Sequence, residues 1–194
     1  MIKNLTSIKK NISKETNNIL KIKKTKVFNS LDNVLKTYKE EYKYSPLLRK
    51  VSKKFDILKV DSYKEKKKNI DKKILNQYKN QYSIITINGL FQKNESKIPS
   101  GISVNTFDNL NNTDKKFFHK FFNNQDDSKS DIFTSINTIN YKESLLIKID
   151  KNYSKKDHVN ILNFIISNSG ESINHIRKLI VSNQNSKSVF IEEF

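Results

Sequence analysis

Residues 82–90 read Tyr-Ser-Ile-Ile-Thr-Ile-Asn-Gly-Leu, and the character of the chain changes where they begin. The run is rich in β-branched residues and is closed by Gly89, which predicts a strand. Residues 102–107 alternate apolar and polar side chains, which predicts a second strand paired with the first across a long polar loop. A folded domain is therefore predicted to begin near residue 81.

The remainder of this domain is predicted to combine helices and strands. Residues 113–122 carry four phenylalanines on one helical face, and 132–139 and 145–149 are interpreted as strands. Two helices are predicted at 158–168 and 171–182, before a last short strand at 189–191. The fold class is thus α+β: a basic, mainly helical N-terminal extension, then a small α+β domain with an antiparallel or mixed sheet and a C-terminal helical hairpin.

Residues 1–80 are predicted to be mainly helical. They contain no glycine and a single proline, Pro46. Apolar side chains recur at helical spacing in residues 1–14, in a segment capped by Ser30 and ended by Pro46, and again in 47–58 and 61–80. The predicted domains are therefore a basic helical nucleic-acid-binding arm at 1–80 and an α+β domain at 81–194.

The charge of the chain is unevenly distributed. The 194 residues carry 37 basic and 20 acidic side chains. Residues 1–80 hold 23 basic and 8 acidic side chains, a net of +15, whereas 81–194 hold 14 and 12, a net of +2. The absence of alanine and the dominance of lysine indicate an AT-rich coding genome, but such a bias acts on both segments equally. The asymmetry therefore indicates a polyanionic partner for the arm.

Clusters of basic residues in the arm lie next to aromatic residues. Lysines neutralise phosphates, and aromatic rings stack on unpaired bases, so this combination is typical of RNA contacts. The predicted nucleic-acid-binding residues are Lys21, Lys23, Lys24, Lys26, Arg49, Lys50, Lys53, Lys54, Lys64, Lys66, Lys67 and Lys68.

The function predicted from these features is a non-enzymatic RNA-binding protein of a ribonucleoprotein particle. A ribosomal protein or a ribosome-associated factor, including a hibernation or dormancy factor, suits a long basic arm joined to a nearly neutral body. The arm lysines would contact rRNA phosphates, and residues 81–194 would contact ribosomal or other ribonucleoprotein proteins. The expected location is cytoplasmic and ribosome-bound, with a mitochondrial location as the alternative.

Two other functions remain open from the sequence. Residues 158–182 have the rhythm of a helix-turn-helix with Gly170 at the turn, which would make the chain a DNA-binding protein. A small metal-independent ribonuclease or toxin would instead use His158 or His175.

No catalytic residue, metal site or cofactor is predicted. The chain has no cysteine, no Gly-rich phosphate loop and no HExxH motif. Asp126, Asp127 and Asp131 are interpreted as residues of a solvated loop rather than as magnesium ligands. No run of eighteen apolar residues exists, so no transmembrane segment is predicted, and the first residues lack the apolar stretch of a secretory signal.

Overall fold

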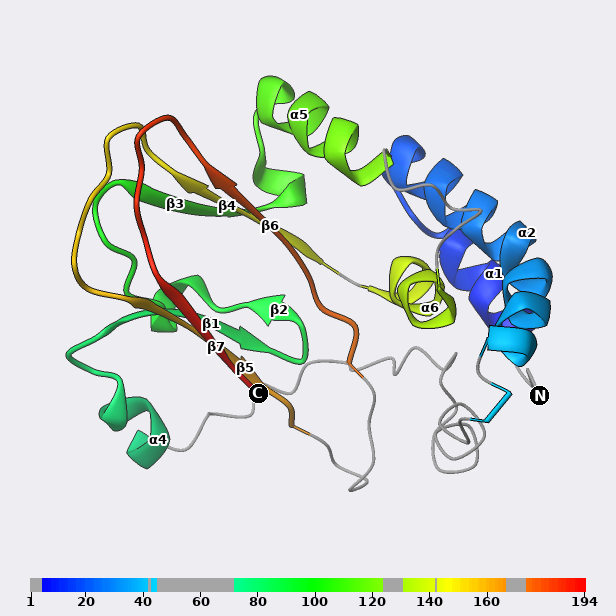
Figure 1. The fold of residues 1–194 in the computed structure, drawn as a ribbon, viewed down its shortest axis with the longest axis horizontal. Helices are drawn as coiled ribbons and strands as arrows, with labels where there is room; N and C mark the ends of the chain where they lie inside the picture. The colour runs from blue at the N-terminus through cyan, green and yellow to red at the C-terminus, as the bar shows by residue number, and fades with distance from the viewer. Residues whose placement is uncertain (1–4, 42, 45–71, 124–130, 142, 167–173) are drawn as a thin grey trace. The chain divides into compact units, whose positions relative to one another are not determined.

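The computed structural model describes residues 5–41, 43–44, 72–123, 131–141, 143–166 and 174–194 (Figure 1). Contacts group the chain into two compact units. Unit 1 comprises Met1–Ser62, Lys116–Tyr141 and Ser169–Ile173, and unit 2 comprises Tyr63–Lys115, Lys142–Asn168 and Asn174–Phe194. The α+β class is confirmed, because helices accompany sheets with both parallel and antiparallel strands. The division into an arm at 1–80 and a domain at 81–194 remains a prediction.

Unit 1 is built around helices α1 (Leu5–Ser13), α2 (Asn18–Glu41) and α6 (Ile132–Asn140). Each helix presents apolar residues at spacings of three or four, which places them on one face. Together they form one buried core of Ile8, Ile12, Val27, Leu31, Val34, Tyr38, Ile132, Ile136 and Ile139. Among the described residues of this helical core, Tyr38 also meets Phe133 edge to face, with ring centroids 6.2 Å apart.

Two predictions in unit 1 are wrong. Helix α2 begins at Asn18 and not at Ser30, because the Asn17 side chain accepts hydrogen bonds from the backbone N–H groups of Ile19 and Leu20 at 3.0 and 3.1 Å. Residues 132–139 are helical and not a strand. The Asp131 side chain caps that helix by accepting from the N–H groups of Phe133 and Thr134.

Helix α5 (Asn112–Asn123) confirms the helix predicted at 113–122. Of the predicted apolar face, Phe118 is fully buried, whereas Phe121 is 49% exposed and packs on Phe117 with ring centroids 4.7 Å apart. The predicted helix at 47–58 lies outside the described residues. Of the one predicted at 61–80, the structure describes the short helix α4 (Lys72–Gln77). Among the described residues, no helix is both long and apolar enough to span a bilayer.

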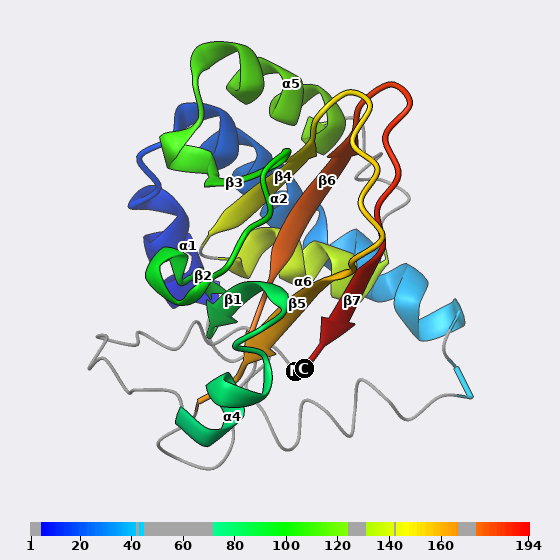
Figure 2. The same cartoon turned by 90° about the vertical axis from the view of Figure 1, so that its left-hand side faces the viewer.

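Unit 2 contains two sheets that face each other (Figures 1 and 2). One sheet has the order β2-β1-β5-β7, from Leu90–Phe91, Tyr82–Ile87, Val159–Phe164 and Phe190–Glu193. The other has the order β3-β4-β6, from Ile102–Thr106, Ser144–Ile149 and Arg177–Ser182. The strands predicted at 102–107, 145–149 and 189–191 are confirmed, and the one predicted at 82–90 is confirmed over Tyr82–Ile87.

The pairing of these strands differs from the prediction. Strand β1 forms its hairpin with β2, across Asn88 and Gly89 with φ angles of 49° and 81°, and not with β3. β3 instead pairs antiparallel with β4 in the other sheet.

From β4 onward the chain winds between the two sheets. Strand β6 pairs in parallel with β4, and β7 pairs in parallel with β5, so each of these last two strands pairs with the strand two before it. In the register of these pairs, Ser144 lies beside Arg177 and Val159 lies beside Phe190. This winding is the pattern of a parallel β-helix, in which a polypeptide coil stacks on the preceding one.

The helical hairpin predicted at 158–182 is wrong, because its residues form β5 and β6. Strand β5 is buried on both faces, which removes the alternation that identifies a strand. Its inner residues Val159 and Ile161 join the core between the sheets, and Leu162 packs with Ile85 on the outer face. The described residues of this segment, 158–166 and 174–182, contain no helix, which removes the structural basis of the DNA-binding alternative.

Candidate functional site

The structure describes four of the twelve residues predicted to bind nucleic acid, and all four lie on α2. Lys23 and Lys24 are buried, with 6% and 7% of their surface exposed, whereas Lys26 is exposed. Lys21 is half-buried and its Nζ donates to the backbone oxygen of Ser13 at 3.1 Å. The other eight lie outside the described residues: Arg49, Lys50, Lys53, Lys54, Lys64, Lys66, Lys67 and Lys68.

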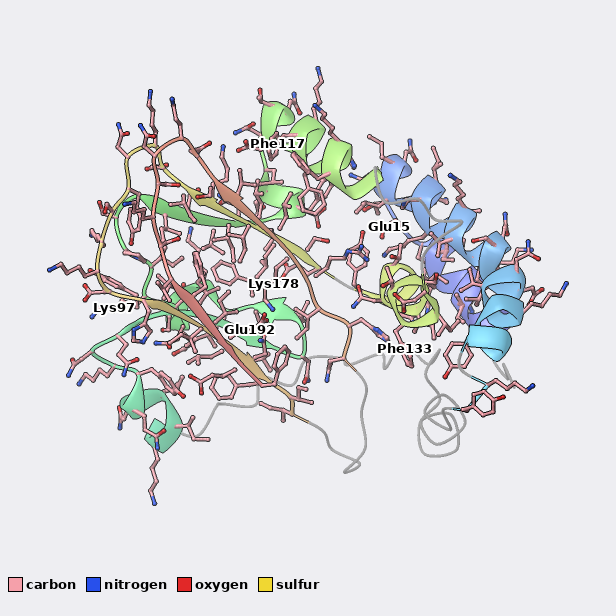
Figure 3. The ribbon with its side chains drawn as sticks, in the orientation of Figure 1. Glu15, Lys97, Phe117, Phe133, Lys178 and Glu192 are labelled. Atoms are coloured by element: carbon pink, nitrogen blue, oxygen red, sulfur yellow. The ribbon has the colours of Figure 1, made fainter. Side chains whose placement is uncertain are left out.

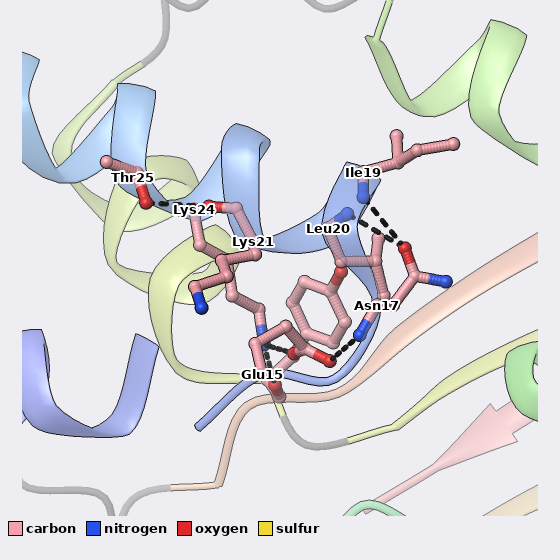
Figure 4. Close-up of polar contacts among 8 residues, drawn as sticks. Glu15, Asn17, Ile19, Leu20, Lys21, Lys24 and Thr25 are labelled. Atoms are coloured by element: carbon pink, nitrogen blue, oxygen red, sulfur yellow. Dashed lines mark hydrogen bonds and ion pairs between the residues drawn. The ribbon is translucent and has the colours of Figure 1, made fainter. Parts of the chain in front are cut away.

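Lys24 is enclosed by acceptors inside unit 1 (Figure 4). Its Nζ lies 2.9 Å from Glu15 Oε2 and 3.2 Å from the backbone oxygen of Tyr141, and 4.5 Å from the centre of the Tyr141 ring. A buried ammonium needs such acceptors, because an unpaired charge in the interior is strongly unfavourable. Lys24 therefore links the turn between α1 and α2 to the end of α6.

A second polar cluster crosses the interior of unit 2 (Figure 3). Lys178 on β6 extends toward the facing sheet, where its Nζ lies 2.6 Å from Glu192 Oε1 and 3.0 Å from Asn163 Oδ1. Asn163 Oδ1 also accepts from Thr86 Oγ1 at 2.9 Å, and Asn163 Nδ2 donates to Glu192 Oε1 at 2.9 Å. Each of these four residues comes from a different strand, so the cluster ties the two sheets together.

The sequence did not single out this inter-sheet cluster. Lys178 falls within the helix-turn-helix predicted at 158–182, and no motif pointed to Thr86, Asn163 or Glu192. The side chain of Lys178 is only 10% exposed. Both of its acceptors lie within hydrogen-bond distance, so the arrangement suits a structural tie between sheets rather than a cation offered to a ligand.

The three histidines occupy separate places in the fold. His119 lies on α5 and is buried, which lowers the pKa of its imidazole. His158 is half-buried just before β5. His175 precedes β6, and its backbone oxygen lies 3.2 Å from the Cβ position that a side chain at Gly89 would occupy.

We expect His175 to make stability depend on pH. Burial lowers the pKa of its imidazole from 6.5 to about 4, and Nε2 has no hydrogen-bond partner among the described residues. Between those values the unfolded chain binds a proton that the folded chain does not, so stability is complete above pH 6.5 and falls below it. The free energy of unfolding from urea titrations should drop by about 1–2 kcal/mol between pH 7.5 and 5.0 through this group. His175→Gln should show a drop smaller by that amount, and an undiminished drop would contradict the assignment.

The described residues offer no clustered donors for a metal ion. The chain has no cysteine, so it supplies no thiolate ligand. Within the described ranges, no group of three or more His, Asp or Glu side chains gathers as a metal site would require. Asp131 caps α6. Burial raises the pKa of its carboxyl, but the hydrogen bonds from Thr134 and Phe133 lower that pKa by more, so the net pKa is lowered. Asp126 and Asp127 lie outside the described residues.

Comparison with known families contradicts the predicted function. The model of the SufBD protein N-terminal region matches residues 2–161, which is most of the chain. SufBD proteins belong to an Fe–S cluster assembly system, so the predictions of an RNA-binding and of a ribosomal protein are wrong. The family works with SufC and other Suf proteins, so the predicted partners, rRNA and ribosomal proteins, are wrong. The predicted ribosome-bound location is wrong for the same reason. No curated protein matches the chain. The chain therefore belongs to the SufBD family, with residues 2–161 corresponding to the N-terminal region of its members.

Proposed function

We propose that this chain is a non-catalytic scaffold part of a SufBD-type complex in which an Fe–S cluster is assembled as the product. The observation that carries the proposal is the family match over residues 2–161. The family works with SufC and other Suf proteins, and SufC is accordingly the expected partner of this chain.

The donor set of the chain supports a scaffold role. Fe–S clusters are held mainly by cysteine thiolates, and these 194 residues contain none. Thiolate ligands for a nascent cluster would therefore come from outside this sequence. The stacked strands of unit 2 and the tie between its sheets support a rigid frame on which such partners assemble.

The proposal is tested by purification of the tagged full chain from its own host. SufC should be recovered with the tagged chain well above its recovery from an untagged strain, and ribosomal proteins should not. Depletion of the chain should lower the activity of an Fe–S-dependent dehydratase while a zinc-dependent enzyme in the same extract keeps its activity. Recovery of ribosomes without SufC, or an equal loss of both activities, would contradict the proposal.

A further inference from the structure

Two lysines from different segments of unit 2 converge on the ring of Tyr82, at the start of β1. Lys97 Nζ lies 5.8 Å from the ring centre and Lys155 Nζ lies 5.7 Å from it. The two ammonium groups are thus separated by about 12 Å at most, which is comparable with the Debye length of ~8 Å at physiological ionic strength. We name Tyr82, Lys97 and Lys155 the Tyr82 surface; Lys97 is labelled in Figure 3.

The backbone holds both lysines in place. Lys97 exchanges two hydrogen bonds of 2.9 Å with Ser83, the residue after Tyr82. The segment before Lys155 is held by a 2.7 Å hydrogen bond from the Lys187 N–H to the Tyr153 oxygen and by the bridge between Ser154 and Lys187. The Tyr82 ring itself packs against the core between the sheets. The positions of the two charges are therefore set by the fold of unit 2.

Neither lysine is neutralised within the part of the chain that the structure describes. Both are exposed, and neither forms an ion pair with a described carboxylate. Two like charges on one ring repel each other, and the negative face of the ring offsets this only in part. The binding of two carboxylates from outside would neutralise both lysines and remove this repulsion.

The surroundings favour a short acidic peptide over a nucleic acid. Glu95 and Asp157 are exposed close in sequence to the two lysines, and Asp157 lies near enough to Tyr153 to help raise the pKa of that phenol, after burial and Tyr82. The closely spaced phosphates of a nucleic acid would be repelled by Glu95 and Asp157. A peptide whose carboxylates are separated by neutral residues can bind the two lysines without approaching these acidic side chains. The two ammonium groups also lie over the Tyr82 ring, whose face a nucleic-acid base would need for stacking.

We infer that the Tyr82 surface is a docking site for an acidic segment of a protein partner, with Lys97 and Lys155 each pairing with one carboxylate. The inference goes beyond the scaffold role and does not require SufC to be the partner. It is tested on the purified chain alone, so its failure would leave the proposed function standing, and failure of that function would leave the docking site standing.

The test uses fluorescence anisotropy with a fluorescein-labelled peptide of eight alternating Glu and Ser residues. The full chain should bind this probe at low salt, and Lys97→Gln/Lys155→Gln should weaken binding about fivefold to tenfold, as expected for two exposed ion pairs. The matched control Lys9→Gln/Lys36→Gln removes the same charge from exposed positions on α1 and α2 and should change binding less than about twofold.

Two outcomes would overturn the docking site. An equal loss in both double variants would show that only the net charge of the chain attracts the probe. An octamer of uridylate that binds the parent chain more tightly than the peptide does, and loses that advantage in Lys97→Gln/Lys155→Gln, would identify a nucleic-acid site instead. Circular dichroism and thermal melting of each variant establish that the fold is unchanged before binding is compared.

Discussion

Replacing Lys24 by alanine is expected to lower the free energy of unfolding by about 3 kcal/mol, the lower end of what the loss of one partner of a buried pair costs. The side chains of Lys24 and Glu15 are only 8% and 20% exposed. Without the ammonium, the Glu15 carboxylate loses its cation and the Tyr141 carbonyl loses a donor, while a void replaces the lysine stem. Urea denaturation followed by circular dichroism measures the effect.

A neighbouring lysine provides the control for this substitution. Lys21→Ala removes one exposed hydrogen bond, to the Ser13 oxygen, and should cost less than about 1 kcal/mol. The double variant Lys24→Met/Glu15→Gln should recover most of the loss, because an apolar side chain of similar length fills the space and no unpaired carboxylate remains. If Lys24→Ala and Lys21→Ala were equally mild, Lys24 would be a surface cation and the buried pair would be refuted.

Replacing Gly101 by alanine is expected to lower the free energy of unfolding by about 2–4 kcal/mol. Gly101 has a φ of 91°, which L side chains rarely adopt, and an added Cβ would lie 2.7 Å from Tyr153 Cδ2. The Tyr153 ring is 7% exposed and belongs to the core between the sheets, so it has little room to withdraw. Thermal melting and urea denaturation at pH 7.5 measure the loss.

Gly89 separates the two causes of this loss. It also has a positive φ, of 81°, but its added Cβ would come no closer than 3.2 Å to another atom, the His175 oxygen. Gly89→Ala should therefore show mainly the backbone cost, and Gly101→Ala should exceed it. Shortening the ring in Gly101→Ala/Tyr153→Leu should cost less than the sum of the two single changes. Strict additivity of the two changes would mean that the ring contact has no energetic effect.

The strands that were predicted correctly are those whose residue composition matches their burial in the fold. Strand β1 is dominated by β-branched residues, and β3 alternates, with Ile102 and Val104 buried and Ser103 and Asn105 exposed. The hairpin between β1 and β2 was missed, although Asn88-Gly89 is the usual signal for a two-residue turn. The longer loop to residue 102 was taken as the connection instead, which assigned β3 to the wrong sheet.

The errors elsewhere have physical causes. In 132–139, the isoleucines and threonines suggested a strand, but Ile132, Ile136 and Ile139 share one helical face after the Asp131 cap. Around β5, burial of both faces produced an apolar run that fits either element type. Tertiary pairing with β1 and β7 decides for the strand, and a single sequence does not display that pairing.

The site was harder to anticipate than the fold. Counting charge over residues 1–80 treats every lysine as a surface cation, but Lys23 and Lys24 are buried. Amphipathic periodicity could have raised this possibility, since Lys24 lies one turn before the buried residue Val27 and two turns before the buried residue Leu31. The inter-sheet cluster depends on strands that meet only in three dimensions, so its residues carry no local signature.

The winding of unit 2 and the place of α6 in the chain have a consequence for synthesis on the ribosome. Helices α1 and α2 leave the tunnel before α6, which completes their core and whose residues are made only after β1, β2 and β3. Strand β3 likewise cannot pair until β4 has been made, and β1 cannot pair with β5 until β5 has been made. At about 5–20 residues per second, apolar surface on the first two helices stays uncovered for several seconds. Binding to chaperones during translation is therefore expected to be concentrated on α1 and α2.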